Sequence, residues 1–364
     1  MTVERLDDRQ RAELKRDPSV VALARAMPLR LIAPTARAEA APGGDNWGLA
    51  AVGATRGGQF DGAGVSVAVL DTGIDAGHEA FRGIVLGPDN VVDFTGEGSD
   101  DVDGHGTHCA GTIFGRPVEG ANIGVAPGIT RVFIGKVIGQ RQSSSKMLFN
   151  AMDWAASSGP QVISMSLGFD FPGMVGSLTD DNWPIELATS HALSAFRGNL
   201  DVFDAIMAKI DALARAGAGI AGASGAIVVA ATGNESRVDT DSKFRLAASL
   251  PAAARGIFAV GALGRLSDDR LKLANFSNGG AALCAPGVDI LSARAGGGLA
   301  TMSGTSMATP HVAGIAALWC QALARPGRIN LPQAVGARLL ATAQTRVIEG
   351  YDAAACGDGI ARGP

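Results

Sequence analysis

The sequence predicts an α/β fold with a doubly wound, mainly parallel sheet and helices on both of its faces. Five short runs rich in valine and isoleucine are apolar along their whole length, which is typical of strands that are covered on both faces. These runs occupy residues 64–71, 130–138, 161–168, 226–234 and 256–263. Helical segments separate them, and right-handed crossovers between successive strands place such strands in one parallel sheet.

Two of the connecting segments carry helical patterns. In the first, apolar residues recur at helical spacing and a glycine ends the pattern. These residues are Met147, Leu148, Ala151, Trp154 and Ala155, followed by Gly159. The second segment, residues 186–217, is longer. Because glycine disfavours a helix interior, we expect a break there near Gly198 and Asn199.

The composition is that of a globular chain. Of its 364 residues, 47% are hydrophobic and 18% are charged, so the chain can bury a large core in one large or two medium domains. A net charge of −4 with scattered basic residues gives no footprint for nucleic acid, and no apolar run is long enough to span a membrane. The N-terminus is rich in charge and lacks the apolar region of a secretory signal. We therefore expect a cytoplasmic protein as the chain is written, or a secreted one if it belongs to a longer precursor.

Three side chains that can activate a hydroxyl nucleophile lie where strands end or helices begin. Asp71 ends the first apolar run, His105 opens a helix in residues 103–112, and Ser306 opens another in residues 303–314. The working groups of a doubly wound sheet gather at the carboxyl ends of its strands. An imidazole can take the serine proton while a carboxylate holds the ring in the required tautomer. The three residues therefore predict nucleophilic catalysis.

The helix start at Ser306 suits a nucleophile. The free N–H groups of a first helical turn point toward developing negative charge. We expect Pro310 to lie near the end of that first turn, where its missing N–H costs little. His311 is one turn or more past Ser306, and we expect it to face elsewhere.

Five sequence blocks, in this order along the chain, resemble the signatures of the subtilisin-like serine proteases: DTGID, HGTHCAGT, SMSLG, ATGN and GTSMATPHVAG. The resemblance covers about residues 46 to 345. It implies that Asp71 orients the ring of the general base His105, and that Ser306 is the nucleophile. It also implies that the Asn234 amide and the Ser306 backbone N–H form the oxyanion hole.

The same resemblance implies two substrate-binding elements. One is a backbone edge that pairs with an extended substrate as an added strand. Its residues are Ser166, Leu167 and Gly168. The other is a wall of the pocket for the side chain before the cleaved bond. Its residues are Ala231, Thr232 and Gly233.

Other readings of the site residues stay open. Asp75 also follows the first strand, but it lies beyond the turn at Gly73. His108 and Cys109 suggest a zinc site without a fourth ligand at usable spacing, so we favour a packed histidine and a buried thiol under His105. We expect all four cysteines to be buried free thiols and not disulfides. They are Cys109, Cys284, Cys320 and Cys356.

Catalysis of this kind requires no cofactor, and a structural calcium ion is left open. Residues 100–106 resemble a calcium loop but lack the later glutamate, so we expect a solvated turn there. Residues 114–128 are shorter than the calcium loop of secreted subtilisins, so that family site is expected to be absent. A weaker site near Asp268 and Asp269 is left open.

We divide the chain into an N-terminal arm with a linker, residues 1–45, and a peptidase domain, residues 46–364. The domain carries an insertion at about 169–209 that is expected near the cleft. Residues 6–34 resemble the end of an inhibitory prodomain, and RLIAP, residues 30–34, resembles the short blocking peptide of intracellular subtilisins. We expect residues 27–34 to lie in or beside the cleft and to restrain activity until the chain is cut between about Ala33 and Asp45. The alternative is a packing arm or a disordered leader.

The expected function is that of a serine endopeptidase acting on peptide or protein substrates, with its own N-terminal segment as an intramolecular inhibitor. A dedicated maturation protease for one precursor peptide is one alternative. A catalytically silent binding protein with the same fold is another. The intact set of Asp71, His105, Ser306 and Asn234 argues against the silent protein.

Overall fold

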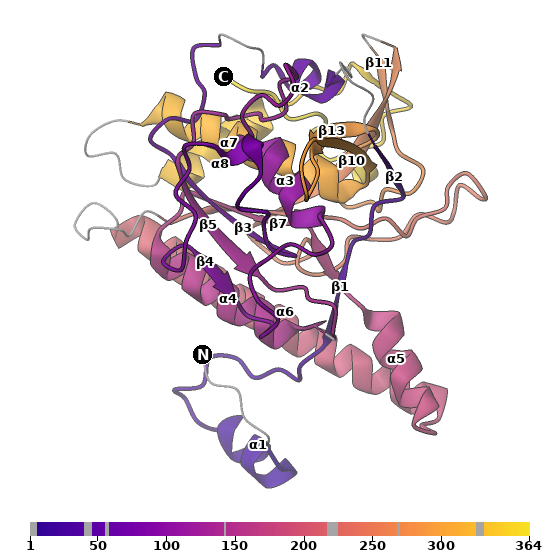
Figure 1. The fold of residues 1–364 in the computed structure, drawn as a ribbon. Coiled ribbons are helices and arrows are strands. Elements are labelled where there is room, and N and C mark those ends of the chain that lie inside the picture. Colours follow the sequence, from indigo (N-terminus) through magenta and orange to yellow (C-terminus); the bar gives the residue numbers. More distant parts are fainter. Residues whose placement is uncertain are drawn as a thin grey trace.

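The computed structural model of the protein describes residues 6–39, 46–54, 58–141, 143–216, 225–267, 270–324 and 331–364. Its centre is the mainly parallel sheet that the sequence predicts (Figure 1). In spatial order its strands are β15 (Ile348–Glu349), β11 (Arg270–Leu273), β10 (Ile257–Ser267), β9 (Ile227–Ala231), β7 (Val162–Met165), β3 (Ser66–Asp71), β5 (Arg131–Lys136) and β4 (Val91–Asp93), and β12 (Leu283–Pro286) also pairs with β10. The pairs from β10 to β4 are parallel, and β11 runs antiparallel to β10.

Helices cover both faces of this sheet, as predicted. One face packs against α3 (His105–Phe114), α7 (Thr305–Leu323) and α8 (Leu331–Ala341), and the other against α4 (Ser145–Ser158) and α6 (Ile185–Ala216). The alternation of side chains along β3 serves both layers. Val67 and Val69 belong to the first core, whereas Ala68 and Leu70 belong to the second. The continuous apolar run of β3 is therefore explained by burial on two faces.

The smaller elements complete the domain. They are α2 (Trp47–Val52), a 3₁₀ helix (Glu79–Phe81), β13 (Ile290–Ala293), β14 (Leu299–Ser303) and α9 (Ala353–Cys356). All four cysteines are free and buried, as expected. Among the described helices, none has the length and apolar character needed to cross a bilayer.

The insertion forms two helices, α5 (Phe171–Asp180) and the first part of α6. The predicted break in α6 is wrong, because the helix is continuous from Ile185 to Ala216. Asn199 stays helical, and its Nδ2 donates to the Ala195 carbonyl one turn earlier and to the Arg25 carbonyl of the N-terminal segment, both at 2.8 Å. Gly198 leaves room for that same segment, since a Cβ there would lie 3.0 Å from the Leu23 carbonyl oxygen. The two residues mark a crossing point of the chain and not a helix break.

The N-terminal segment, residues 6–39, is called the arm below. It begins with α1 (Asp8–Leu14) and then runs extended along the domain (Figure 1). Its strand β1 (Pro28–Leu31) lies between β6 (Ser143–Ser144) and β8 (Leu167–Phe169) and is antiparallel to both. Its strand β2 (Ala36–Glu39) pairs antiparallel with β14. The arm thus joins two separate edges of the domain as an added strand.

Candidate active site

Asp71 and His105 form a buried pair. Asp71 is the last residue of β3, and His105 is the first residue of α3. His105 Nδ1 lies 2.7 Å from Asp71 Oδ1. Burial lowers the pKa of His105, but the Asp71 carboxylate outweighs this effect and holds the pKa well above its ordinary value. The carboxylate fixes the ring through Nδ1, so Nε2 is the nitrogen left to exchange a proton.

Thr72 and Asp101 join the end of β3 to the start of α3. Thr72 Oγ1 donates to Asp101 Oδ1 at 2.7 Å and accepts from the Gly106 backbone N–H at 2.8 Å. Asp101 Oδ2 accepts from the backbone N–H and the hydroxyl of Thr107 at 2.7 and 2.6 Å. The turn at residues 100–106 is exposed at Val102 and Asp103, but the expected solvation is wrong at Asp101, which is buried and accepts from the N–H groups of Gly104 and Thr107 at the start of α3. An aspartate a few residues before a helix start was the signal that could have revealed it.

His108 and Cys109 pack beneath the pair. His108 Nε2 lies 3.0 Å from the Ile290 carbonyl oxygen, and burial lowers the pKa of His108 to about 3, so its ring is neutral. The Cys109 sulfur lies 3.8 Å from His105 Nδ1 and donates to the Ser306 carbonyl oxygen at 3.4 Å. Burial raises the pKa of Cys109, so the thiol stays protonated. Both placements agree with the packed histidine and the buried thiol that the sequence favours.

Asp75 and His311 lie away from the pair. The Asp75 carboxylate accepts from the backbone N–H groups of Gly77 and Gly296 at 3.1 and 2.8 Å. His311 is buried in α7, with its Nδ1 2.8 Å from the Met307 carbonyl oxygen. Burial lowers the pKa of His311 to about 4. These contacts give both residues structural roles.

Ser306 is the second residue of α7, where the sequence places it. Pro310, however, lies inside the helix and not in its first turn. Its missing N–H would have bonded to the Ser306 carbonyl, four residues back. That carbonyl instead accepts from the Ser166 hydroxyl at 3.1 Å and from the Cys109 thiol. The expectation for Pro310 is therefore wrong, and the proline frees an acceptor that ties Ser306 to a neighbouring strand edge and to α3.

Asn234 follows β9 and has its amide held by Thr305. Asn234 Oδ1 accepts from the Thr305 backbone N–H and hydroxyl, each at 2.8 Å. The amide nitrogen Nδ2 therefore points away from Thr305. Gly304 makes room for it, since a Cβ at that position would lie 2.8 Å from Asn234 Nδ2. A donor preset in this way can bind an oxygen that develops negative charge.

The arm fills this centre. Ser306 Oγ donates to the Ile32 carbonyl oxygen at 3.0 Å, and Asn234 Nδ2 donates to the next carbonyl oxygen, that of Ala33, at 3.0 Å. His105 Nε2 has no hydrogen-bond partner within the described part of the chain. Ser306 Oγ also lies 3.3 Å from the Ser166 carbonyl oxygen of the domain. The serine hydroxyl is therefore directed at backbone carbonyls and not at the imidazole.

The predicted substrate edge is occupied by β1. The residue pairs are Leu31 with Leu167, Arg30 with Gly168 and Leu29 with Phe169. Ile32 is almost fully buried, and its Cγ1 would lie 3.3 Å from a Cβ on Gly168. Sequence reasoning missed the opposite edge, β6, because two serines carry no strand pattern. There Leu29 pairs with Ser143 and Pro28 with Ser144.

The predicted pocket wall is buried behind the serine. The Gly233 N–H donates to Thr305 Oγ1 at 3.2 Å, and Thr232 Oγ1 donates to the Asn278 carbonyl oxygen at 3.2 Å. Ala231 ends β9 and is fully buried. These bonds tie the wall to the residues around Ser306, while its contact with a substrate stays a prediction.

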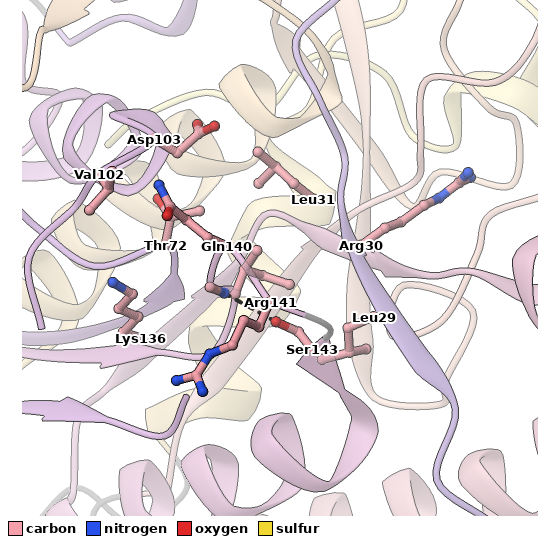
Figure 2. A pocket seen from close by; sticks show the side chains of 12 residues that line it. Leu29, Arg30, Leu31, Thr72, Val102, Asp103, Lys136, Gln140, Arg141 and Ser143 are labelled. Atoms are coloured by element: carbon pink, nitrogen blue, oxygen red, sulfur yellow. Dashed lines mark hydrogen bonds between the residues drawn. The ribbon is translucent and has the colours of Figure 1, made fainter. Parts of the chain in front are cut away.

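A cavity of about 440 Å³ lies beside strand β1 of the arm. Figure 2 shows the Leu31 and Arg30 side chains on opposite sides of the strand, and both residues belong to the lining of the cavity. The lining includes Thr72, Val102 and Lys136 from the domain. Side chains at alternate positions of a bound strand would therefore meet different surfaces.

A structural calcium ion, which the sequence leaves open, stays untested. The ligand atoms of Asp71, His105 and Cys109 lie within 4.8 Å of one another, but these groups already contact each other as described. Asp268 and Asp269, named for a weak calcium site, lie outside the described residues.

Comparisons with known proteins find related serine proteases. A model of the subtilase family matches residues 62–359. A thermophilic serine proteinase of Bacillus sp. (strain AK1) is 33% identical over 74% of this chain and 54% of the relative. An intracellular serine protease of Paenibacillus polymyxa is 34% identical over 71% of this chain and 68% of the relative. The crystal structure of a cold adapted subtilisin-like serine proteinase aligns with a TM-score of 0.59 at 28% identity, covering 87% of this chain and 97% of that one. This chain spans about half the length of the first of these relatives.

Proposed function

Because this chain belongs to the subtilase family, we propose that it is a serine endopeptidase that hydrolyses peptide or protein substrates through an acyl-enzyme. His105 takes the proton of Ser306 as Oγ attacks the carbonyl carbon, and it returns that proton to the leaving amine. Asp71 orients the ring and stabilises the imidazolium that forms. The observation that carries the proposal is the buried 2.7 Å contact between His105 Nδ1 and Asp71 Oδ1.

The oxyanion of the tetrahedral intermediate would be held by two donors, Asn234 Nδ2 and the Ser306 backbone N–H. The support for the first donor is its contact with a carbonyl oxygen of the arm, at 3.0 Å. The Thr305 contacts fix this amide before a substrate arrives, so no reorganisation is needed during the reaction.

Labelling with a serine-directed fluorophosphonate tests the nucleophile. We expect the probe to label protein freed of its arm, and the label to be lost in Ser306→Ala. Ser157→Ala is the matched control, because Ser157 is an exposed serine of α4 whose hydroxyl bonds to the Asp153 carbonyl and to Lys209 Nζ and to no residue of the proposed site. A freed protein that takes no label and cleaves no peptide would support the silent binding protein instead.

We further propose that the arm restrains the enzyme by lying in the cleft with no carbonyl placed for attack. A cleavable carbonyl must meet Ser306 Oγ and the Asn234 amide at once, with the reacting atoms about 3–3.5 Å apart. Here the Ile32 carbonyl contacts the serine while the Ala33 carbonyl contacts the amide. The two contacts are divided between successive residues, so neither carbonyl makes both. The arm therefore occupies the site without presenting a bond for attack.

Contacts upstream of the cleft support the same proposal. Met27 is fully buried, and its backbone exchanges bonds with Ser145: its N–H donates to Ser145 Oγ at 3.0 Å and its carbonyl accepts from the Ser145 N–H at 2.8 Å. Asn199 of the insertion holds the Arg25 carbonyl. Release would thus require the chain to be cut and the arm to leave the cleft. Part of the range proposed for the cut, residues 40–45, lies outside the described residues.

A controlled cut tests the restraint. A recognition sequence for a site-specific protease replaces residues 40–45, so the chain folds with its arm and is cut afterwards. The arm is then removed by dilution and gel filtration. We expect kcat/KM for a short peptide to rise at least tenfold on removal and to fall again when the arm peptide is returned, because a bound strand competes directly with substrate. Equal activity with and without the arm would make it a bystander.

A further inference from the structure

Arg30 projects from β1 toward two carboxylates. Its guanidinium lies 2.5 Å from Glu235 Oε1 and 3.6 Å from Asp170 Oδ1. The Arg30 side chain is 37% exposed and each carboxylate is 28% exposed, so the contacts are partly shielded from solvent. Figure 2 shows the Arg30 side chain on the side of the strand opposite to that of Leu31. The arginine therefore has a contact site of its own.

Each carboxylate also accepts a hydrogen bond from the domain, while the Asp170 backbone N–H donates to the Pro28 carbonyl of the arm at 3.0 Å. Glu235 Oε2 accepts from Asn278 Nδ2 at 2.7 Å, which leaves Oε1 directed at Arg30. Asp170 Oδ1 accepts from the Gly173 N–H at 3.0 Å as the cap of α5. The two acids come from different segments, the loop after β9 and the start of the insertion. Removing the arm would leave them in place beside the cleft.

The register of β1 assigns this site to one position of a bound chain. Arg30 pairs with Gly168 and lies two residues before Ile32, whose carbonyl contacts Ser306. A substrate strand on the same edge, with the residue at the Ile32 position supplying the acyl group, would direct its third side chain back from the cleaved bond toward the acids. The alternation of a strand prevents its neighbours from doing so.

We infer that Glu235 and Asp170 form a subsite for a cationic side chain, arginine above lysine, at the third residue before the cleaved bond. The inference rests on the proposed peptidase function. The planar guanidinium can reach two carboxylates at once, whereas an ammonium is a single point charge. The subsite would select substrates, and it would also hold the arm through Arg30.

Peptide substrates test the subsite in protein freed of its arm. Three peptides carry arginine, glutamine or glutamate at that third position, and the cleaved bond is checked by mass. We expect arginine to exceed glutamine in kcat/KM by about 3- to 10-fold, with glutamate lowest, since partly exposed ion pairs contribute modestly. The preference should shrink in 1 M salt. Cleavage of all three at equal rates would overturn the subsite while leaving the peptidase standing, whereas no cleavage at all would count against the peptidase.

A double-mutant cycle tests the specific contact. The arm peptide, residues 23–39, is added as an inhibitor with arginine or glutamine at position 30. We expect the glutamine peptide to bind about 3- to 10-fold more weakly to the freed wild type, and this difference to vanish in Glu235→Gln. Asp170→Asn, which keeps the cap of α5, should reduce the difference in affinity between the two peptides in part. Asp239→Asn is the control, because Asp239 is an exposed acid on the loop that carries Glu235. A difference that survives in both Glu235→Gln and Asp170→Asn would refute the assignment.

Discussion

The two sides of the catalytic centre are in different states. On the acid–base side, Asp71 and His105 already make the 2.7 Å contact that the chemistry needs. On the nucleophile side, Ser306 and Asn234 each bind a different carbonyl of the arm. The first side is held within the domain by the bonds of Thr72 and Asp101 to the start of α3. The second side is held in its present arrangement by a segment that, in our proposal, leaves after a cut.

The two sides therefore differ in what must still change before the proposed reaction can begin. The bonds that fix Asn234 come from Thr305, so the proposed oxyanion donor is oriented by the domain itself. The serine hydroxyl must turn toward His105 Nε2 from two carbonyl oxygens, that of Ile32 in the arm and that of Ser166 in the domain. A hydroxyl rotor changes its partner at little cost, and departure of the arm removes the shorter of these two contacts. Departure of the arm is thus the expected switch.

Removal of the nucleophile should have the largest effect. In freed protein, Ser306→Ala should lower kcat by about a millionfold, the scale found for the nucleophile of subtilisin, a member of the same family. The arm should remain bound in the full chain, because it keeps its strand pairs with β6 and β8. Peptide hydrolysis and protection of the arm from added protease would measure the two effects. Substantial turnover by the pure variant would remove Ser306 from its proposed role.

The acid–base side comes next. Asp71→Asn keeps the shape of the side chain but removes the charge that orients His105, so we expect kcat to fall by about 10,000-fold. Arm-peptide affinity should change little, since the described bonds of the arm do not include Asp71. If the arm peptide instead lost most of its affinity, the two sides would not be independent. Binding of the arm peptide and hydrolysis are measured on the same preparation.

The oxyanion donor should give a smaller loss that touches both chemistry and arm. Asn234→Ala should reduce kcat by about 100- to 1000-fold with little change in KM, because the amide is needed most in the transition state. It should also lower the affinity for the arm peptide by several-fold, because the bond to the Ala33 carbonyl is lost. Thr305→Val removes the hydroxyl that orients the amide and should lower kcat less, with Thr305→Ser as the control that keeps the hydroxyl. A variant that loses affinity for substrate and keeps kcat would make Asn234 a binding residue only.

The sequence predicted the acid–base side and the positions of Ser306 and Asn234 because each follows a strand or opens a helix with its own motif. It also predicted the five apolar strands, because burial on both faces leaves a continuous apolar run. It failed at Asp101, Pro310 and Gly198. At each of these, a bond or close approach from a distant segment decides the structure, and local propensity does not record such contacts.

For the arm, too, one part of the structure could be predicted from the sequence and another could not. Its apolar, extended end was readable from the sequence, but its register was not. Register depends on which residue meets Gly168 and on how two successive carbonyls divide between Ser306 and Asn234. Glu235 and Asp170 also escaped notice, because two acids 65 positions apart become neighbours only through the fold.

The smallest expected effect is the dependence on pH, which probes the acid–base side alone. Asp71 holds the pKa of His105 above its ordinary value of 6.5, in spite of burial, so the ring is protonated and inactive over a wider range of pH. Activity should therefore rise with pH through a midpoint above 6.5. The same sign applies to folding: the raised pKa adds stability below pH 6.5, and this contribution is lost as pH rises through the pKa of the folded protein. Profiles of kcat/KM for freed wild type and Asp71→Asn measure the shift, and the variant should move the midpoint down. A wild-type midpoint at or below that of the variant would show that the Asp71 charge does not control His105.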